Sequence, residues 1–261
     1  MTQTAGQDRL IVALDVDSIE RGAELADQLR RVRMFKLGWR LLMAGLRTRG
    51  LAELWQSITA TGREIFVDLK VPDIGNTVAD VVGDLARDPQ VRFLTLHENM
   101  QARDIERARA ARGESATPQL LMVPFVSSLS AEDFPKVAPA AVAQGMTMNE
   151  WILERAGSAL DRGCDGIIAS GDAIALCRNR WPRDGAREVV IVSPGIRPAG
   201  SGADDHKRLT TPTDAIRAGA DYLVVGRPIL HAPDPAAAAD AIISEVDAVL
   251  LSGAEKAKET E

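Results

Sequence analysis

Short apolar runs rich in β-branched residues recur eight times along the chain, and amphipathic segments separate them. The runs LIVALDV, QLLMVPFV and EVVIVSPG are almost continuously apolar. Such runs are typical of parallel strands that are buried on both faces. We therefore predict eight strands, over Leu10–Val16, Met34–Gly38, Glu64–Lys70, Arg92–Glu98, Gln119–Val126, Gly166–Ser170, Glu188–Gly195 and Asp221–Ile229.

The segments between these runs carry helix signals. Ser18 is a favourable N-cap, and Gly163 and Gly219 stand where helices end just before the next strand. We predict helices over Ser18–Val32, Ile74–Arg87, Asp104–Arg112, Asn149–Arg162, Thr213–Ala218 and Pro235–Leu250. Strands that alternate with helices in this way predict an α/β protein, a single-domain (β/α)8 TIM barrel.

The barrel is expected to occupy residues 10–250. Residues 1–9 would form an N-terminal tail, and the small and charged residues of 251–261 would form a flexible C-terminal tail. An open doubly wound sheet is the alternative architecture. It is less favoured because the turn after Val16 reads DSIE and lacks the glycine-rich pattern of a dinucleotide-binding turn.

Composition excludes several classes of protein. Of the 261 residues 46% are hydrophobic, which is enough for a packed core and excludes global disorder. No apolar run approaches the roughly 20 residues of a membrane span, and the N-terminus lacks a signal pattern, so we expect a cytoplasmic protein that does not bind membranes. The net charge of −6 and the absence of a Lys/Arg run argue against nucleic-acid binding. Two isolated cysteines and three scattered histidines predict neither a disulfide framework nor a metal site.

Charged residues stand at the carboxyl ends of the predicted strands, where TIM barrels carry their active sites. Asp15, Lys36, Asp68 and Lys70 all occupy such positions. Asp68 and Lys70 are two residues apart, so both side chains point to the same face of an extended strand. Pointing inward, the four would form an alternating array of charges. A purely structural ion-pair network is the alternative, but burying four charges is so unfavourable that a functional role is favoured.

A second group of residues points to phosphate binding. The loop Pro194–Gly202 carries Arg197 among several glycines, and Gly226 and Arg227 end the eighth predicted strand. Loops after the seventh and eighth strands are the usual phosphate site of this fold, and an arginine fork suits a phosphate dianion.

Together these motifs resemble the orotidine 5'-phosphate decarboxylase family. DLKVPDIGNT on the third strand is highly specific, and IVALD, FKLG, PGIR and DYLVVGRPI follow the family's order from about Leu10 to Pro235. The resemblance implies an enzyme that decarboxylates orotidine 5'-phosphate to UMP, the last step of de novo pyrimidine biosynthesis. It also implies catalysis without metal or organic cofactor, and a homodimer of barrels.

The resemblance assigns a role to each charge of the array. Asp15 and Lys36 would hold the ribose hydroxyls, and Asp68 would lie near the departing carboxylate. Lys70, placed by Asp68 and Asp73, would stabilise the carbanion-like centre at C6 and then protonate it.

Further contacts are implied around these charges. Asp73, Ile74 and Thr77 would reach across the dimer into the partner's site. The remaining contacts would be Ser127, with Ser128 as the alternative, at the pyrimidine, Pro194 at the base, and Arg197, His206, Gly226 and Arg227 at the phosphate.

Some residues depart from the family pattern, and two rival functions remain. His206 stands where the family often has glutamine, and Glu98 adds a negative charge at the barrel mouth. One rival is an Mg²⁺-dependent sugar-phosphate enzyme of the wider superfamily, which has a glutamate at the position of Lys36. The other is a catalytically silent nucleotide-binding barrel, which would have no need of Asp68 facing an anionic substrate.

Overall fold

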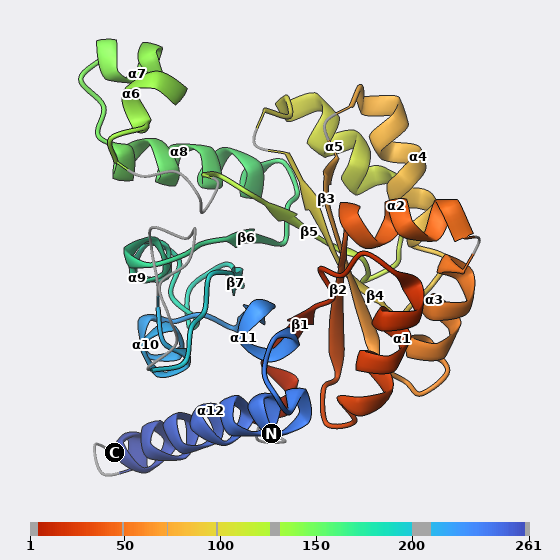
Figure 1. Cartoon of the computed structure of the whole chain (residues 1–261). Helices are drawn as coiled ribbons and strands as arrows, with labels where there is room; N and C mark the ends of the chain where they lie inside the picture. The colour runs from red at the N-terminus through yellow and green to blue at the C-terminus, as the bar shows by residue number, and fades with distance from the viewer. Residues whose placement is uncertain are drawn as a thin grey trace.

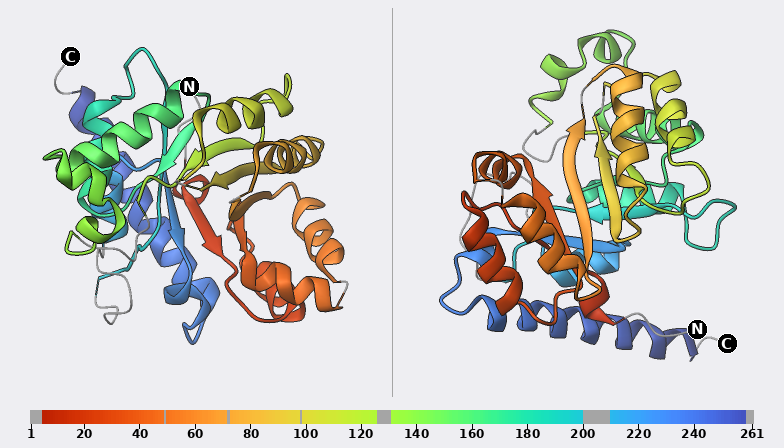
Figure 2. Two further views of the ribbon diagram at one scale, coloured as in Figure 1. Left: turned by 90° about the horizontal axis from the view of Figure 1, so that it is seen from above. Right: turned by 90° about the vertical axis from the view of Figure 1, so that its right-hand side faces the viewer.

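Eight parallel strands close in chain order into one barrel, surrounded by helices (Figures 1 and 2). The computed structural model describes residues 5–48, 50–71, 73–97, 99–125, 131–199 and 210–258, with side chains as far as residue 253. The closed barrel confirms the predicted (β/α)8 fold and excludes the open sheet. No helix in these ranges combines the length and the apolar character that a bilayer span requires.

Strands and helices alternate around the barrel, and several connections contain more than one helix. The strands are β1 (Leu10–Ala13), β2 (Met34–Gly38), β3 (Glu64–Val71), β4 (Val91–Leu96), β5 (Gln119–Met122), β6 (Gly166–Ile168), β7 (Val190–Ser193) and β8 (Tyr222–Val225). The helices are η1 (Gly6–Asp8), α1 (Ile19–Gln28), α2 (Trp39–Thr48), α3 (Leu51–Thr59), α4 (Gly75–Leu85), α5 (Ala102–Ala111), α6 (Phe134–Val137), α7 (Pro139–Ala143), α8 (Met148–Asp161), α9 (Asp172–Arg180), α10 (Pro212–Ala218), α11 (Arg227–Leu230) and α12 (Pro235–Lys258).

The structure differs from the predicted elements mainly in extra helices and in where strands and helices end; β1, β5 and β7, for example, are shorter than predicted. Helices α2, α3, α6, α7, α9 and α11 had no counterpart among the predicted helices. Strand β8 ends at Val225 instead of Ile229, because the backbone turns at Gly226 (φ −116°, ψ −98°) into α11. Helix α12 runs on to Lys258, through most of the segment expected to be a flexible tail. Helix η1 also packs onto this helix, since the N–H of Gly6 donates to Asp247 Oδ1 over 2.6 Å.

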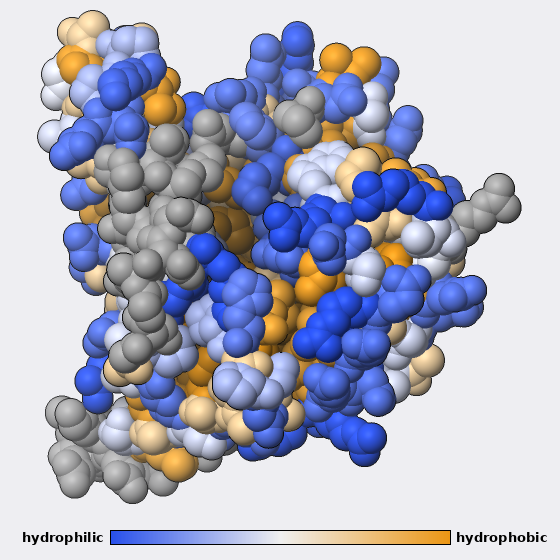
Figure 3. Space-filling model, in the orientation of Figure 1, coloured by the Kyte–Doolittle hydropathy of each residue, from blue (hydrophilic) through white to orange (hydrophobic). Residues whose placement is uncertain are grey.

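Two apolar layers hold the barrel together. One lies between the strands and the helices. Outside the helices, polar residues cover most of the surface seen in Figure 3. The other fills the barrel interior, where Phe66, Phe93 and Tyr222 meet edge to face. Because these side chains block the centre of the barrel, a ligand cannot pass through it, and a site at one end is reached from that end.

Two carboxylates at the N-terminal end of the barrel join neighbouring strands in the same way. Asp165, before β6, accepts the backbone N–H of Leu120 in β5 and both Nη groups of Arg112. Asp221, before β8, accepts a backbone N–H of β7 and the guanidinium of Arg178. Each carboxylate therefore ties one strand to the next and neutralises a buried arginine, which stabilises the end of the barrel opposite the strand carboxyl ends.

Replacing Asp221 with alanine is expected to lower the free energy of unfolding by about 3 kcal/mol, because the largely buried Arg178 loses its counter-charge. The measurement is urea unfolding followed by circular dichroism. Asp161→Ala is the matched control, since the Asp161–Arg187 pair is exposed and its loss changes stability by less than about 1 kcal/mol. Equal effects of the two substitutions would contradict a stabilising role for Asp221.

Candidate active site

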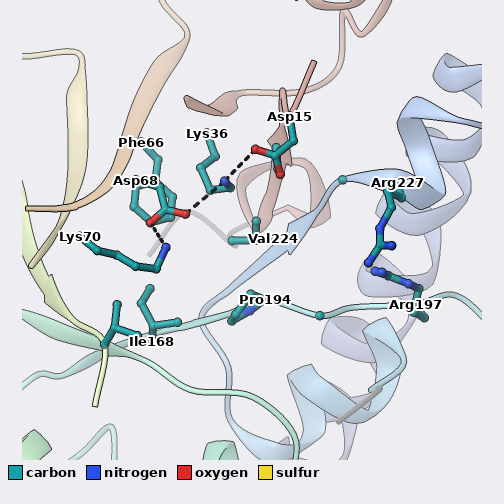
Figure 4. Close-up of a pocket in the computed structure, with 14 residues that line it drawn as sticks. Asp15, Lys36, Phe66, Asp68, Lys70, Ile168, Pro194, Arg197, Val224 and Arg227 are labelled. Carbon is teal, nitrogen blue, oxygen red and sulfur yellow. Dashed lines mark hydrogen bonds and ion pairs between the residues drawn. The ribbon is translucent and has the colours of Figure 1, made fainter. Parts of the chain in front are cut away.

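A cavity of about 220 Å³ opens at the carboxyl ends of the strands. Charged side chains stand on two sides of it, and Phe66, Ile168 and Val224 provide apolar surface between them (Figure 4). The predicted site residues that line this cavity are Asp15, Lys36, Asp68, Lys70, Pro194, Arg197, Gly226 and Arg227.

Four of these residues form a chain of alternating charges along one side of the cavity (Figure 4). Lys36 Nζ lies 3.2 Å from Asp15 Oδ1 and 3.1 Å from Asp68 Oδ2. Lys70 Nζ lies 2.8 Å from Asp68 Oδ1. Asp68 therefore stands between two ammonium groups, and its side chain is only 14% exposed.

Burial and charge oppose each other at Asp68 and Lys36. Burial by itself would raise the pKa of Asp68, but Lys36 and Lys70 outweigh it and lower the pKa to about 2. Burial would likewise lower the pKa of Lys36, yet Asp68 and Asp15 outweigh it, so that its pKa is raised. Both groups are therefore charged at neutral pH. A carboxylate and an ammonium face the same small cavity in fixed positions.

The sequence analysis missed two residues that support the end of β3, Thr95 and Trp39. Lys70 has a φ of 45°, which a non-glycine residue rarely adopts. Its backbone N–H donates to Thr95 Oγ1 over 2.9 Å, and the preceding carbonyl, that of Leu69, accepts from Trp39 Nε1 over 2.9 Å. Thr95 Oγ1 also lies 2.9 Å from Asp68 Oδ1. No local pattern in the sequence marks these two side chains. Thr95 contacts the end of β3 from strand β4, and Trp39 contacts it from helix α2, so both contacts depend on the packing of elements distant in the chain.

Two arginines, one from the loop after β7 and one from the start of α11, meet on the other side of the cavity. Arg197 follows β7 and is buried, with Nη1 donating to its neighbour's carbonyl oxygen, that of Ile196, over 2.9 Å. Arg227 follows β8, and the two guanidinium groups point toward each other (Figure 4). Gly195 has a φ of 77°, so glycine suits this position of the PGIR sequence and lets the chain turn to bring Arg197 to the cavity. Two guanidinium groups on one wall form a strong site for a phosphate dianion.

The residues after β3 lie apart from this cavity. Asp73 and Ile74 line a separate surface hollow of about 590 Å³, together with His97 and Asn99. Asp73, Ile74 and Thr77 are all exposed. Within one chain, the structure therefore does not bring these three residues to the alternating charges.

Four residues named in the sequence analysis lie outside the described part of the chain: Glu98, Ser127, Ser128 and His206. Among the described residues, no three His, Cys, Asp or Glu side chains gather as a metal site would require. Cys164 and Cys177 are both buried, and burial raises the pKa of the Cys177 thiol to about 12, so it is not a reactive thiolate.

Comparison with known proteins decides the family. The family model described as orotidine 5'-phosphate decarboxylase / HUMPS matches residues 8–242. The chain belongs to this family. Curated relatives include the orotidine 5'-phosphate decarboxylases of Methylobacterium sp. (strain 4-46), 42% identical over 92% of this chain and 96% of theirs, and of Ruegeria pomeroyi, 40% identical over 92% and 94%.

Solved structures of the family have the same barrel. Orotidine 5'-phosphate decarboxylase from Lactobacillus acidophilus aligns with a TM-score of 0.71 at 31% identity, covering 92% of this chain and all of that one. The enzyme from Pyrococcus horikoshii OT3 aligns with a TM-score of 0.65 at 26% identity, covering 91% and 98%. The similarity to this family therefore spans the barrel and both sides of its cavity.

The lowered pKa of Asp68 predicts a loss of stability in acid. A carboxyl with an unfolded-state pKa near 3.9 and a folded-state pKa of about 2 stabilises the fold fully above about pH 4, and this contribution disappears as the pH falls toward 2. The difference in unfolding free energy between the wild type and Asp68→Asn should therefore shrink by about 2 kcal/mol between pH 5 and pH 2. Urea unfolding at a series of pH values measures it. A difference that stays constant over this pH range for Asp68→Asn would refute the assignment.

Proposed function

We propose that this protein decarboxylates orotidine 5'-phosphate to UMP, the last step of de novo pyrimidine biosynthesis. The observation that carries the proposal is the Asp15–Lys36–Asp68–Lys70 array facing two arginines across one small cavity. The names of the curated relatives support the same substrate and reaction.

The two sides of the cavity would hold opposite ends of the nucleotide. Arg197 and Arg227 bind the phosphate, and His206 adds a further hydrogen bond to it. On the other side Lys36 donates to a ribose hydroxyl, and Asp15 accepts from one. The pyrimidine lies between them, against Pro194 with Ser127 at its polar edge, which directs C6 toward Lys70.

The chemistry depends on Asp68 and Lys70. The bond between C6 and the carboxylate breaks, carbon dioxide leaves, and the electron pair stays on C6. The ammonium of Lys70 stabilises this charge and then transfers a proton to C6, so that neutral Lys70 takes up a proton from solvent before the next turnover. Asp68 holds Lys70 in place through the 2.8 Å ion pair and faces the departing carboxylate. The phosphate contacts provide binding energy remote from the reacting atoms.

A second copy of the chain would complete each site by contributing Asp73, Ile74 and Thr77. The support is the exposed apolar surface beside them. Helix α2 exposes Trp39, Met43 and Leu46 along one face, and Ile74 is 70% exposed. Trp39 donates to the carbonyl of Leu69, so this face begins beside the end of β3. Exposed apolar side chains on one face of a helix are typical of a subunit interface.

The rival sugar-phosphate enzymes differ from the proposed enzyme because they need a metal ion. That class uses Mg²⁺ and has a glutamate where this chain has Lys36. Lys36 instead pairs with Asp15 and Asp68, and an ammonium at this position repels a divalent cation.

The purified protein should convert orotidine 5'-phosphate to UMP in the presence of EDTA. The loss of orotidine monophosphate absorbance in the ultraviolet measures the rate. Lys70→Ala should lower kcat/KM by at least about 1,000-fold, because both the fixed positive charge and the proton donor are removed. Lys136→Ala on α6 is the control and should retain activity, since Lys136 is exposed and remote from the cavity.

An inactive wild-type protein, or a rate that appears only with Mg²⁺ and a sugar phosphate, would overturn the proposed reaction. Near-normal turnover by Lys70→Ala would leave the reaction intact and refute the assigned proton donor. These outcomes separate an error in the substrate from an error in the catalytic residue.

A shared site predicts complementation between two inactive variants. When Lys70→Ala and Asp73→Asn chains form mixed dimers, one of the two sites regains both wild-type residues, so random mixing should restore about a quarter of wild-type activity. Steady-state turnover after co-refolding measures it. Lys70→Ala mixed with Asp68→Asn is the matched control, because both residues belong to the same site of one chain. No rescue in the first mixture would exclude a contribution of Asp73 in trans.

A further inference from the structure

The end of β3 carries two more residues than the facing segment of β4. Val67 pairs with Leu94 and Val71 pairs with Leu96, so Asp68, Leu69 and Lys70 together face the single residue Thr95. Strand β3 therefore bulges at the two charged residues that line the cavity. A bulge removes ladder hydrogen bonds, and the backbone groups that it frees must find other partners.

The hydroxyl of Thr95 provides one of those partners. It accepts the backbone N–H of Lys70 over 2.9 Å and lies 2.9 Å from Asp68 Oδ1. A carboxylate between two ammonium groups is an acceptor only, so the hydroxyl proton must be donated to Asp68. The direction of both hydrogen bonds is thereby determined.

These contacts form a closed ring of hydrogen bonds that passes through one oxygen atom, Asp68 Oδ1. Asp68 Oδ1 receives the ammonium of Lys70 from one side, over 2.8 Å, and the hydroxyl of Thr95 from the other. The same hydroxyl holds the backbone of Lys70, which has a φ of 45° and is the only non-glycine residue with positive φ in the described part of the chain. Both ends of Lys70 are thus attached to Asp68, one directly and one through Thr95.

We propose that Thr95 is a positioning residue that sets the direction of the Lys70 ammonium and the Asp68 carboxylate. This inference rests on the proposed function, because it assumes that these two groups act on the substrate. Thr95 does not line the cavity and is 1% exposed, so it acts through its two neighbours. A left-handed backbone at a long side chain is unfavourable and persists only where its surroundings hold it.

Substitution by valine removes the hydroxyl and keeps the shape of the side chain. It leaves the N–H of Lys70 without a partner and removes one hydrogen bond from Asp68. In Thr95→Val we expect kcat to fall by about ten- to a hundredfold, whereas the dissociation constant of UMP stays within about threefold, because phosphate and ribose contacts lie elsewhere. Thr95→Ser keeps the hydroxyl and should recover kcat to within about threefold of the wild type.

Steady-state kinetics, UMP titration and thermal unfolding of the two variants test this. Thr59→Val is the matched control, since the Thr59 hydroxyl donates to Trp55 O within α3, far from the array. A wild-type kcat in Thr95→Val would overturn the proposal. Equal losses in the serine and valine variants, or a loss of UMP affinity parallel to kcat, would also overturn it, because the methyl group or the general fold would then be responsible.

Crystal structures of the same variants give a result that does not depend on turnover. In Thr95→Val the backbone of Lys70 should leave the left-handed region and Nζ should move out of hydrogen-bond distance of Asp68, whereas Thr95→Ser should keep both. An unchanged Lys70 in Thr95→Val would refute the positioning role even if the wild type proved inactive on orotidine 5'-phosphate. Inactivity of the wild type with the expected shift in Thr95→Val would instead refute the proposed function alone.

Discussion

The buried carboxylate of Asp68 is the charge on which the rest of the site depends. Without it, the ammonium groups of Lys36 and Lys70 would repel each other in a small and poorly solvated space. With it, the two remain charged and fixed near the same cavity. Removing one partner of a buried ion pair lowers the free energy of unfolding by about 3–5 kcal/mol. The charge that remains then has neither solvent nor a counter-charge to stabilise it.

The barrel separates this unfavourable concentration of charge from the residues that stabilise the fold. Asp165 and Asp221 join strands at the N-terminal end, and a plug of aromatic and aliphatic side chains fills the middle. The carboxyl ends are therefore free to carry residues chosen for chemistry. Even there the local strain at Lys70 is offset by contacts from other elements, Thr95 on β4 and Trp39 on α2.

The separation of the two arginines from Lys70, on opposite walls of the cavity, matters for the proposed reaction. Arg197 and Arg227 lie on the opposite wall from Lys70 (Figure 4), so a ligand that reaches both walls is held at its far end while its reacting end meets the fixed charges. Binding energy from the remote end then contributes to placing the reacting atoms, as catalysis by differential binding requires. Apolar residues line the cavity between the walls, and the side chains of Lys36 and Asp68 are largely shielded from solvent, which strengthens their effect on developing charge.

The sequence by itself predicted the barrel from local periodicity, and it placed the charges of both cavity walls at the carboxyl ends of the strands, where they line the cavity. Eight apolar runs predicted eight strands, and the spacing of Asp68 and Lys70 placed both on one face. Tertiary structure alone decided what depends on neighbours distant in the chain. The bulge opposite Thr95 arises from the register between β3 and β4, and Arg197 meets Arg227 because the segment after β7 packs beside the start of α11. Asp73 lies outside the cavity because the chain turns away after β3. Register, the meeting of the two arginines and chain direction are set by packing between elements, which no window of sequence contains.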